Sequence, residues 1–111
     1  MLEKSKKITQ FLKTKININP DFGIILGTGL GKLAEEINVL LSISYKDIPD
    51  FPVSTVKGHD GKLIFGELAN KFVIAMQGRF HFYEGYTMEE VTLPVRIMKL
   101  IGVKKLIVSN A

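Results

Sequence analysis

The sequence predicts an α/β fold in which a mixed, mainly parallel sheet is flanked by helices. Short apolar runs closed by glycines alternate with segments whose apolar residues recur at helical spacing. The run "FGIIL" at residues 22–26 is continuous enough for a strand that is buried on both faces. With 111 residues, 46% of them hydrophobic, the chain is expected to form one domain around one core.

Two helices are predicted in the first half of the chain. The first is amphipathic and places its lysines in solvent, with an apolar stripe formed by Ile8, Phe11, Leu12 and Ile16. The second begins near Lys32, with a stripe formed by Leu33, Ile37, Leu40 and Leu41. "SISY" at residues 42–45 is a candidate strand, and residues 46–61, with two prolines and two glycines, are expected to be mostly loop.

The second half of the chain predicts a hairpin, a helix and a final strand. "KLIFGEL" (62–68) and "KFVIAMQ" (71–77) are strands joined by a turn at residues 69–70. Thr87 and Glu90 form a capping-box signature for a helix that ends near Gly102. Pro94 implies a kink in that helix or a short turn followed by a new start. "KKLIVSNA" (104–111) is predicted to be another buried strand.

Composition and charge exclude several classes of function. The chain has no cysteine, which excludes disulfides, thiolate metal sites and cysteine nucleophiles. No apolar run approaches the roughly 18 residues of a membrane-spanning helix, and the N-terminus lacks an apolar signal core, so we expect a cytoplasmic protein without a membrane partner. All of the net charge of +4 lies in residues 1–16, which favours a solvated helix face over nucleic-acid binding.

Three polar segments follow predicted strands, where ligands gather in α/β sheets. "GTGLG" (27–31) joins a strand to a helix, where glycines and free N–H groups suit an anion, and the hydroxyl of Thr28 can add a hydrogen bond. The loop matches neither a dinucleotide fingerprint nor a P-loop, and its glycines are equally compatible with a tight turn. The other two segments begin at Arg79 and at Asn110.

Histidines and an arginine supply further candidates for anion binding. If residues 79–81 are extended, Arg79 and His81 face one side and can hold a phosphate, whereas a surface pair of Arg79 with Glu84 is the alternative. His59, between two glycines in "KGHDG", is by itself more typical of a surface residue. Two histidines without a nearby carboxylate cluster make a poor metal site.

Four motifs together resemble the purine nucleoside phosphorylases of the trimeric class. "GIILGTGLG", "KGHDG", "MQGRFHFYEGY" and "VSNA" occur in that family in the same order and at similar spacing, from about residue 20 to the last residue. "GRFHFYEGY" is the most specific of them. The resemblance implies a nucleoside phosphorylase fold, of which residues 1–111 are the N-terminal part of a single domain.

The resemblance also implies a reaction and its residues. Phosphate attacks a purine nucleoside and gives free base and ribose 1-phosphate, as in purine salvage, with no cofactor and with a homotrimer as the full-length assembly. Phosphate would be held by Thr28, His59, Arg79, His81 and the backbone N–H of Ala111. Tyr83 would contact the ribose, and Glu84 would orient the network, so that His81 and Glu84 are the catalytic candidates.

The sequence departs from that family in two respects. The family more often has serine at the position of Thr28, and threonine occurs in the related methylthioadenosine phosphorylases, which usually lack the "FYEGY" aromatics. Members are also much longer, and their base-recognising residues and a further phosphate-binding serine follow the part matched here. We therefore expect an N-terminal fragment that is inactive alone. A non-catalytic phosphate-binding or assembly module and a methylthioadenosine phosphorylase-like enzyme are the alternatives.

Overall fold

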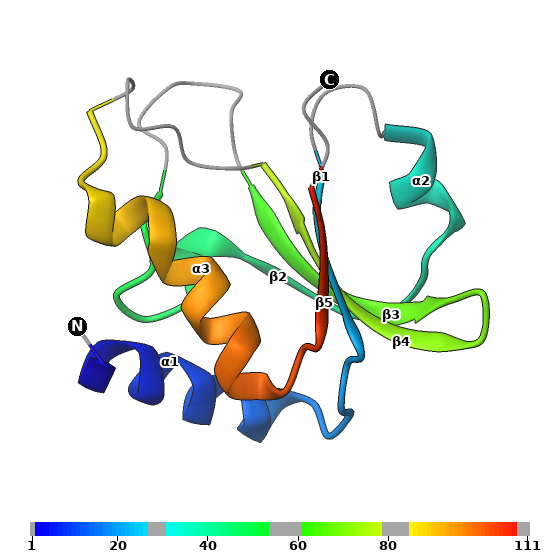
Figure 1. The fold of residues 1–111 in the computed structure, drawn as a ribbon, viewed down its shortest axis with the longest axis horizontal. Helices are drawn as coiled ribbons and strands as arrows, with labels where there is room; N and C mark the ends of the chain where they lie inside the picture. The colour runs from blue at the N-terminus through cyan, green and yellow to red at the C-terminus, as the bar shows by residue number, and fades with distance from the viewer. Residues whose placement is uncertain (1, 27–30, 54–60, 79–84, 109–111) are drawn as a thin grey trace.

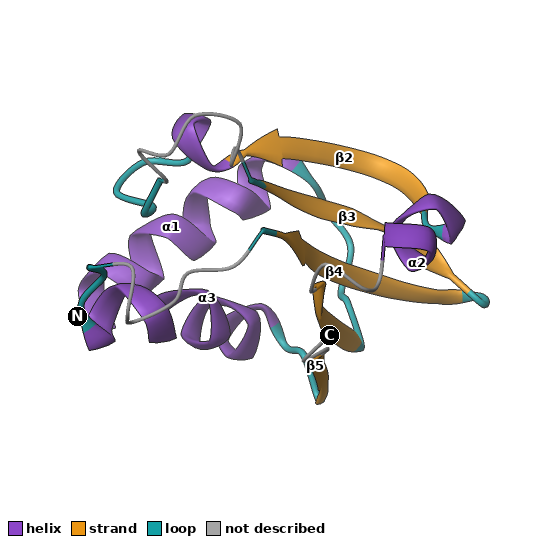
Figure 2. Ribbon diagram, turned by 90° about the horizontal axis from the view of Figure 1, so that it is seen from above, coloured by secondary structure: helices purple, strands orange, loops and turns teal. Residues whose placement is uncertain are grey.

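A computed structural model describes residues 2–26, 31–53, 61–78 and 85–108 of the chain. Its elements follow one another in the order α1 (Leu2–Lys15), β1 (Phe22–Leu26), α2 (Gly31–Glu36), β2 (Asn38–Ser44), the short 3-10 helix η2 (Tyr45–Asp47), β3 (Lys62–Leu68), β4 (Lys71–Gln77), α3 (Met88–Ile101) and β5 (Lys105–Val108). Helices α1 and α3 cover one face of the sheet and α2 lies against the other (Figures 1 and 2). Within the described ranges, no helix is long and apolar enough to cross a membrane.

The five strands form one mixed sheet in the order β2-β3-β4-β1-β5. β1 runs parallel to both of its neighbours, β4 and β5, whereas β3 runs antiparallel to β2 and β4. The predicted mixed sheet flanked by helices is confirmed. Its parallel part is the group β4-β1-β5, which is the part that brings strand ends together at one edge.

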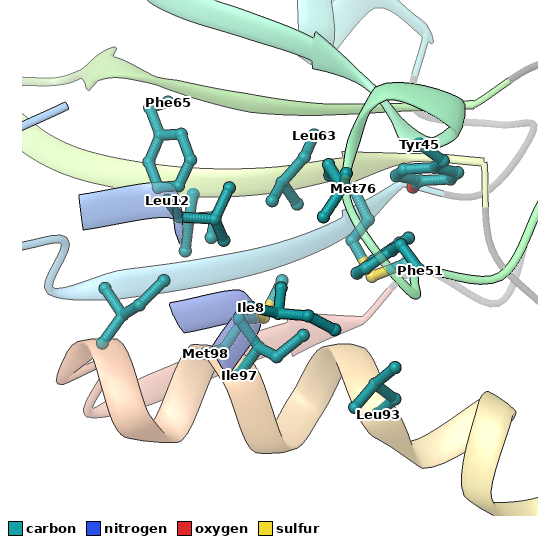
Figure 3. Close-up of a cluster of buried hydrophobic side chains, with 13 residues drawn as sticks. Ile8, Leu12, Tyr45, Phe51, Leu63, Phe65, Met76, Leu93, Ile97 and Met98 are labelled. Carbon is teal, nitrogen blue, oxygen red and sulfur yellow. The ribbon is translucent and has the colours of Figure 1, made fainter. Parts of the chain in front are cut away.

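The hairpin of β3 and β4 supplies the core on both faces of the sheet. Alternate residues of a strand point to opposite faces. Leu63, Phe65, Ile74 and Met76 accordingly pack with Ile8 and Leu12 of α1 and with Leu93, Ile97 and Met98 of α3 (Figure 3). Ile64, Val73 and Ala75 pack on the other side, with Ile24 of β1 and with Leu33 and Ala34 of α2.

The amphipathic first helix is confirmed. Ile8 and Leu12 are each 1% exposed, whereas the five lysines of residues 1–16 all lie in solvent. The buried stripe holds α1 against α3, so the apolar face of α1 is already used inside the fold.

The prediction for the second helix is wrong in its length. Helix α2 ends at Glu36, and Leu40 and Leu41 belong to strand β2. β2 pairs with β3 from Asn38 to Ser44, with a register shift between Val39 and Leu41. Backbone pairing with β3 therefore decides the conformation, although the side chains alone suit a helix. The candidate strand "SISY" is the end of β2, with Tyr45 already in η2.

Helix α3 follows its predicted boundaries. The Thr87 side chain accepts a hydrogen bond from the N–H of Glu90 at 3.1 Å, and the Glu90 carboxylate accepts one from the N–H of Thr87 at 3.0 Å. Gly102 ends the helix in the left-handed conformation. A single helix runs through Pro94, so the alternative of a new start after this proline is wrong.

Strand β5 was predicted to be buried on both faces, but all four of its residues are exposed. It pairs with β1 along one edge only, so it is an outer strand of the described sheet. Leu106, Ile107 and Val108 expose 41%, 47% and 46% of their surface, which makes this strand the most apolar exposed segment of the sheet. The strand itself is confirmed and its burial is not.

Candidate functional site

The carboxyl ends of three parallel strands meet at one edge of the sheet. Leu26 of β1 lies beside Gln77 of β4, and Ile25 of β1 lies beside Val108 of β5. β3 runs the other way, so its first residue, Lys62, also lies beside Gln77. Figure 1 shows these strand ends together along the upper edge of the sheet. We refer to this border, formed by Leu26, Lys62, Gln77 and Val108, as the strand-end edge.

All of the predicted site residues lie in segments that leave the strand-end edge. Those residues are Thr28, His59, Arg79, His81, Tyr83, Glu84 and Ala111, and all of them lie outside the described residues, so their roles stay predictions. The structure does bring together the strand ends to which they are attached. The three polar segments after β1, β4 and β5 therefore start from one edge of the sheet.

Tyr45 links the chain before β3 to the chain after β4. Its hydroxyl donates a hydrogen bond to the carbonyl of Gly78, and its backbone N–H donates one to the carbonyl of Gly61 at 3.1 Å. The side chain is 3% exposed, and its ring lies 4.9 Å from that of Phe51 between centroids. Burial raises the pKa of the Tyr45 hydroxyl well above its ordinary value of 10.0.

Two glycines make room for this contact. A Cβ on Gly61 would overlap the Tyr45 ring, and a Cβ on Gly78 would lie 3.2 Å from the Cα of Gly61. Gly78 also has φ of 98°, a conformation that side chains rarely adopt. The motifs "KGHDG" and "QGRFH" therefore carry glycines at the points where their two chain segments leave the sheet side by side.

A second tyrosine links the far ends of the same two segments. The Tyr86 hydroxyl donates a hydrogen bond to the carbonyl of Val53 at 3.1 Å. Val53 is the last described residue before 54–60, and Tyr86 follows 79–84 by two residues. The described residues that flank 54–60 are consequently linked to those that flank 79–84 on both sides of these segments.

Sequence reasoning missed both of these hydroxyl contacts. Tyr86 belongs to the aromatic motif "GRFHFYEGY", whereas Tyr45 stands at the end of an ordinary strand pattern. The partner of Tyr45 is 33 residues away along the chain, so no local spacing marks it.

Comparison with known proteins shows that the chain belongs to the Phosphorylase superfamily, which it matches over residues 21–111. It is 55% identical over all 111 residues to purine nucleoside phosphorylase 1 of Bacillus subtilis, and covers 41% of that protein. It is 42% identical over 109 residues to purine nucleoside phosphorylase of Rattus norvegicus, with 98% of this chain and 38% of that protein covered.

Solved structures give the same result. Purine nucleoside phosphorylase from Schistosoma mansoni in complex with acetate superposes with a TM-score of 0.92 at 51% identity, covering 98% of this chain and 40% of that one. A purine nucleoside phosphorylase in complex with ribose 1-phosphate gives a TM-score of 0.93 at 51% identity, with 99% and 40% covered. The chain thus spans about two-fifths of the length of its relatives, with the resemblance to purine nucleoside phosphorylases confirmed.

Proposed function

We propose that this chain provides the phosphate-binding part of a phosphorylase that cleaves purine nucleosides. In the reaction an oxygen of inorganic phosphate bonds to the anomeric carbon of the ribose as the carbon–nitrogen bond to the purine breaks. The electron pair of that bond leaves with the base, which takes up a proton, and ribose 1-phosphate is the second product. The observation that carries the proposal is that the strand ends to which the four motifs are attached along the chain lie together at the strand-end edge.

The proposed roles follow from the chemistry of each group. Thr28, His59, Arg79, His81 and the N–H of Ala111 donate hydrogen bonds to phosphate, with the Arg79 guanidinium as its planar, permanently charged partner. Tyr83 contacts the ribose. Glu84 accepts a hydrogen bond from His81 and so orients it. These assignments rest on the motifs and on the convergence of their strands.

Electrostatics explain why a site for this reaction would hold phosphate in a fixed position. As the base departs, positive charge develops on the sugar, and a phosphate anion fixed beneath it stabilises that charge by position. Arg79 and the histidines thus fix the anion and need not transfer protons in this step. The reaction proposed here uses phosphate as co-substrate and needs no cofactor.

The proposal extends to assembly and setting. We propose a homotrimer that acts in purine salvage in the cytoplasm. The names of the relatives support action on purine nucleosides, and the salvage role is what the motif resemblance implies. The trimer rests on the motif resemblance alone.

Turnover in a hybrid enzyme tests the proposed function. Residues 1–111 replace the matching segment of the Bacillus subtilis relative, and release of free base from inosine or guanosine is followed with and without phosphate. We expect release that depends on phosphate in the hybrid. We expect none from the 111-residue chain alone, because it spans only 41% of that relative. Release of base without phosphate, or turnover by the 111 residues alone that Arg79→Ala abolishes, would contradict the proposal.

Arginine variants provide the matched control. Arg79→Ala should abolish saturation by phosphate while leaving the melting temperature nearly unchanged. Arg96→Ala removes the other arginine of the chain, which is exposed on α3, and should leave both properties intact. A collapsed melting temperature with an unchanged saturation curve in Arg79→Ala would instead show that Arg79 is structural.

A further inference from the structure

We propose that Tyr45 and Tyr86 are positioning residues: they hold together the described chain that flanks residues 54–60 and 79–84, the two segments that contain the proposed phosphate donors His59 and Arg79. The inference rests on the proposed function, because it concerns the same anion site. Neither tyrosine belongs to the proposed set of phosphate or ribose ligands. Each instead joins chain on one side of residues 54–60 to chain on one side of residues 79–84.

The contact at Tyr45 closes the end of the segments that is nearest the sheet. Three interactions converge there: the hydroxyl on Gly78, the backbone N–H on Gly61, and the ring against Gly61. Lys62 and Gln77, the next residues into the sheet, are already paired. Tyr45 therefore extends the pairing of β3 and β4 by one further residue on each chain, beyond the point where the strands end.

The contact at Tyr86 closes the other end. Val53, whose carbonyl accepts the Tyr86 hydroxyl, lies two residues after Phe51, and Phe51 packs against the ring of Tyr45. Residues 45–53 consequently connect the two contacts. Gly85, with φ of 97°, and the capping box at Thr87 define how the chain passes from the segment into α3.

Two joined segments favour anion binding for a physical reason. Donors on separate segments must be brought to one phosphate, and the ordering of each segment opposes binding. The contacts of Tyr45 and Tyr86 fix the chain on either side of both segments before phosphate arrives, which lowers that ordering cost.

Phenylalanine variants remove each hydroxyl and keep each ring. Dissociation constants for inorganic phosphate are measured for the 111-residue chain carrying Tyr45→Phe or Tyr86→Phe, and phosphate KM and kcat are measured for the same variants of the hybrid enzyme. Because one neutral hydrogen bond is lost, each variant should weaken phosphate binding roughly 3–10-fold. At saturating phosphate, kcat should stay within about twofold, because the reacting groups are unchanged.

Thr9→Val is the matched control. The Thr9 hydroxyl donates a buried hydrogen bond of 2.8 Å to the carbonyl of Ser5 on α1, and valine keeps its shape. In Figure 1, α1 lies at the bottom of the molecule and the strand-end edge at the top. Thr9→Val and the two tyrosine variants should all lower the melting temperature, because each loses a hydrogen bond. Only the tyrosine variants should also lower phosphate affinity.

The outcomes separate the inference from the proposed function. Unchanged phosphate KM in both tyrosine variants of an active hybrid would overturn the inference alone, as would an equal loss in Thr9→Val. Phosphate binding without turnover in the unaltered hybrid would overturn the proposed function alone, and no phosphate binding at all would overturn both. If Tyr45→Phe fails to fold, Tyr86→Phe decides, because Tyr86 is only half-buried.

Discussion

The substitution Gly61→Ala tests the packing around Tyr45 most directly. Its new Cβ would overlap one edge of the Tyr45 ring, lie 2.5 Å from Cδ2, and lie 3.0 Å from the carbonyl oxygen of Gln77. Ordinary van der Waals contact begins at 3.4 Å, so the overlap with Cδ2 by itself requires a movement of 0.9 Å. The Tyr45 ring packs on Phe51, and its hydroxyl donates a hydrogen bond to the carbonyl of Gly78. A shift of that size therefore breaks the hydrogen bond as well.

The cost can be worked out from these two effects. Overpacking a filled core costs about 1–3 kcal/mol, and a lost hydrogen bond costs about 0.5–1.5 kcal/mol. We therefore expect the free energy of unfolding to fall by about 1.5–4.5 kcal/mol. At about 4 °C for each kcal/mol in a chain of this size, the melting temperature should fall by at least about 6 °C.

Differential scanning calorimetry and phosphate titration together provide the assay. Gly66→Ala is the matched control, because its Cβ would overlap the carbonyl of Asn38 and lie 2.7 Å from Ile37, away from the strand-end edge. Both variants should melt at lower temperature, and only Gly61→Ala should also lose phosphate affinity. The reasoning is refuted if Gly61→Ala has the same melting temperature as the unaltered chain, or if Gly66→Ala lowers phosphate affinity by the same factor as Gly61→Ala.

Three further predictions concern single groups. Thr87→Ala removes the capping box of α3 and should cost about 1 kcal/mol in urea unfolding, whereas Thr87→Ser should restore most of it. Stability should fall as pH rises above 10.0, the ordinary pKa of tyrosine, because buried Tyr45 keeps a proton that the unfolded chain loses. The loss of stability from this group approaches about 1.4 kcal/mol per pH unit. Urea unfolding at about pH 9 and 11 should show that loss in the unaltered chain and not in Tyr45→Phe. An equal fall in the free energy of unfolding in both would contradict Tyr45 as the cause. Thr28→Val should weaken phosphate binding by about 1.5–3 kcal/mol while Thr28→Ser stays mild, and equal activity of the two hybrids would exclude the hydroxyl as a ligand.

The elements that were predicted correctly are those whose signals are local. Helix α3 begins at a capping box of four residues and ends at a left-handed glycine, so its boundaries depend on neighbours in the chain. The hairpin of β3 and β4 turns at Ala69 and Asn70, both with positive φ, between two short apolar runs. Such features are set by side-chain and backbone preferences over a few residues.

The failures concern residues whose conformation depends on distant partners. Leu40 and Leu41 fit a helical stripe, but they lie in β2 because its backbone pairs with β3, more than twenty residues later. β5 has the composition of a buried strand, yet the described sheet leaves it at an edge with one partner. Spacing along the chain contains no information about which strand will lie alongside.

The same division holds for the candidate site. Residue types suited to an anion, and the strands that they follow, could be predicted from the sequence, because donors, glycines and apolar runs are local properties. Only the tertiary structure placed β1 between β4 and β5, and so brought three strand ends to one edge. It alone showed that Tyr45 and Tyr86 link the chain flanking residues 54–60 to the chain flanking residues 79–84. Those contacts span 33 residues each, and a hydrogen bond over that distance exists only once the sheet has brought the two chains together.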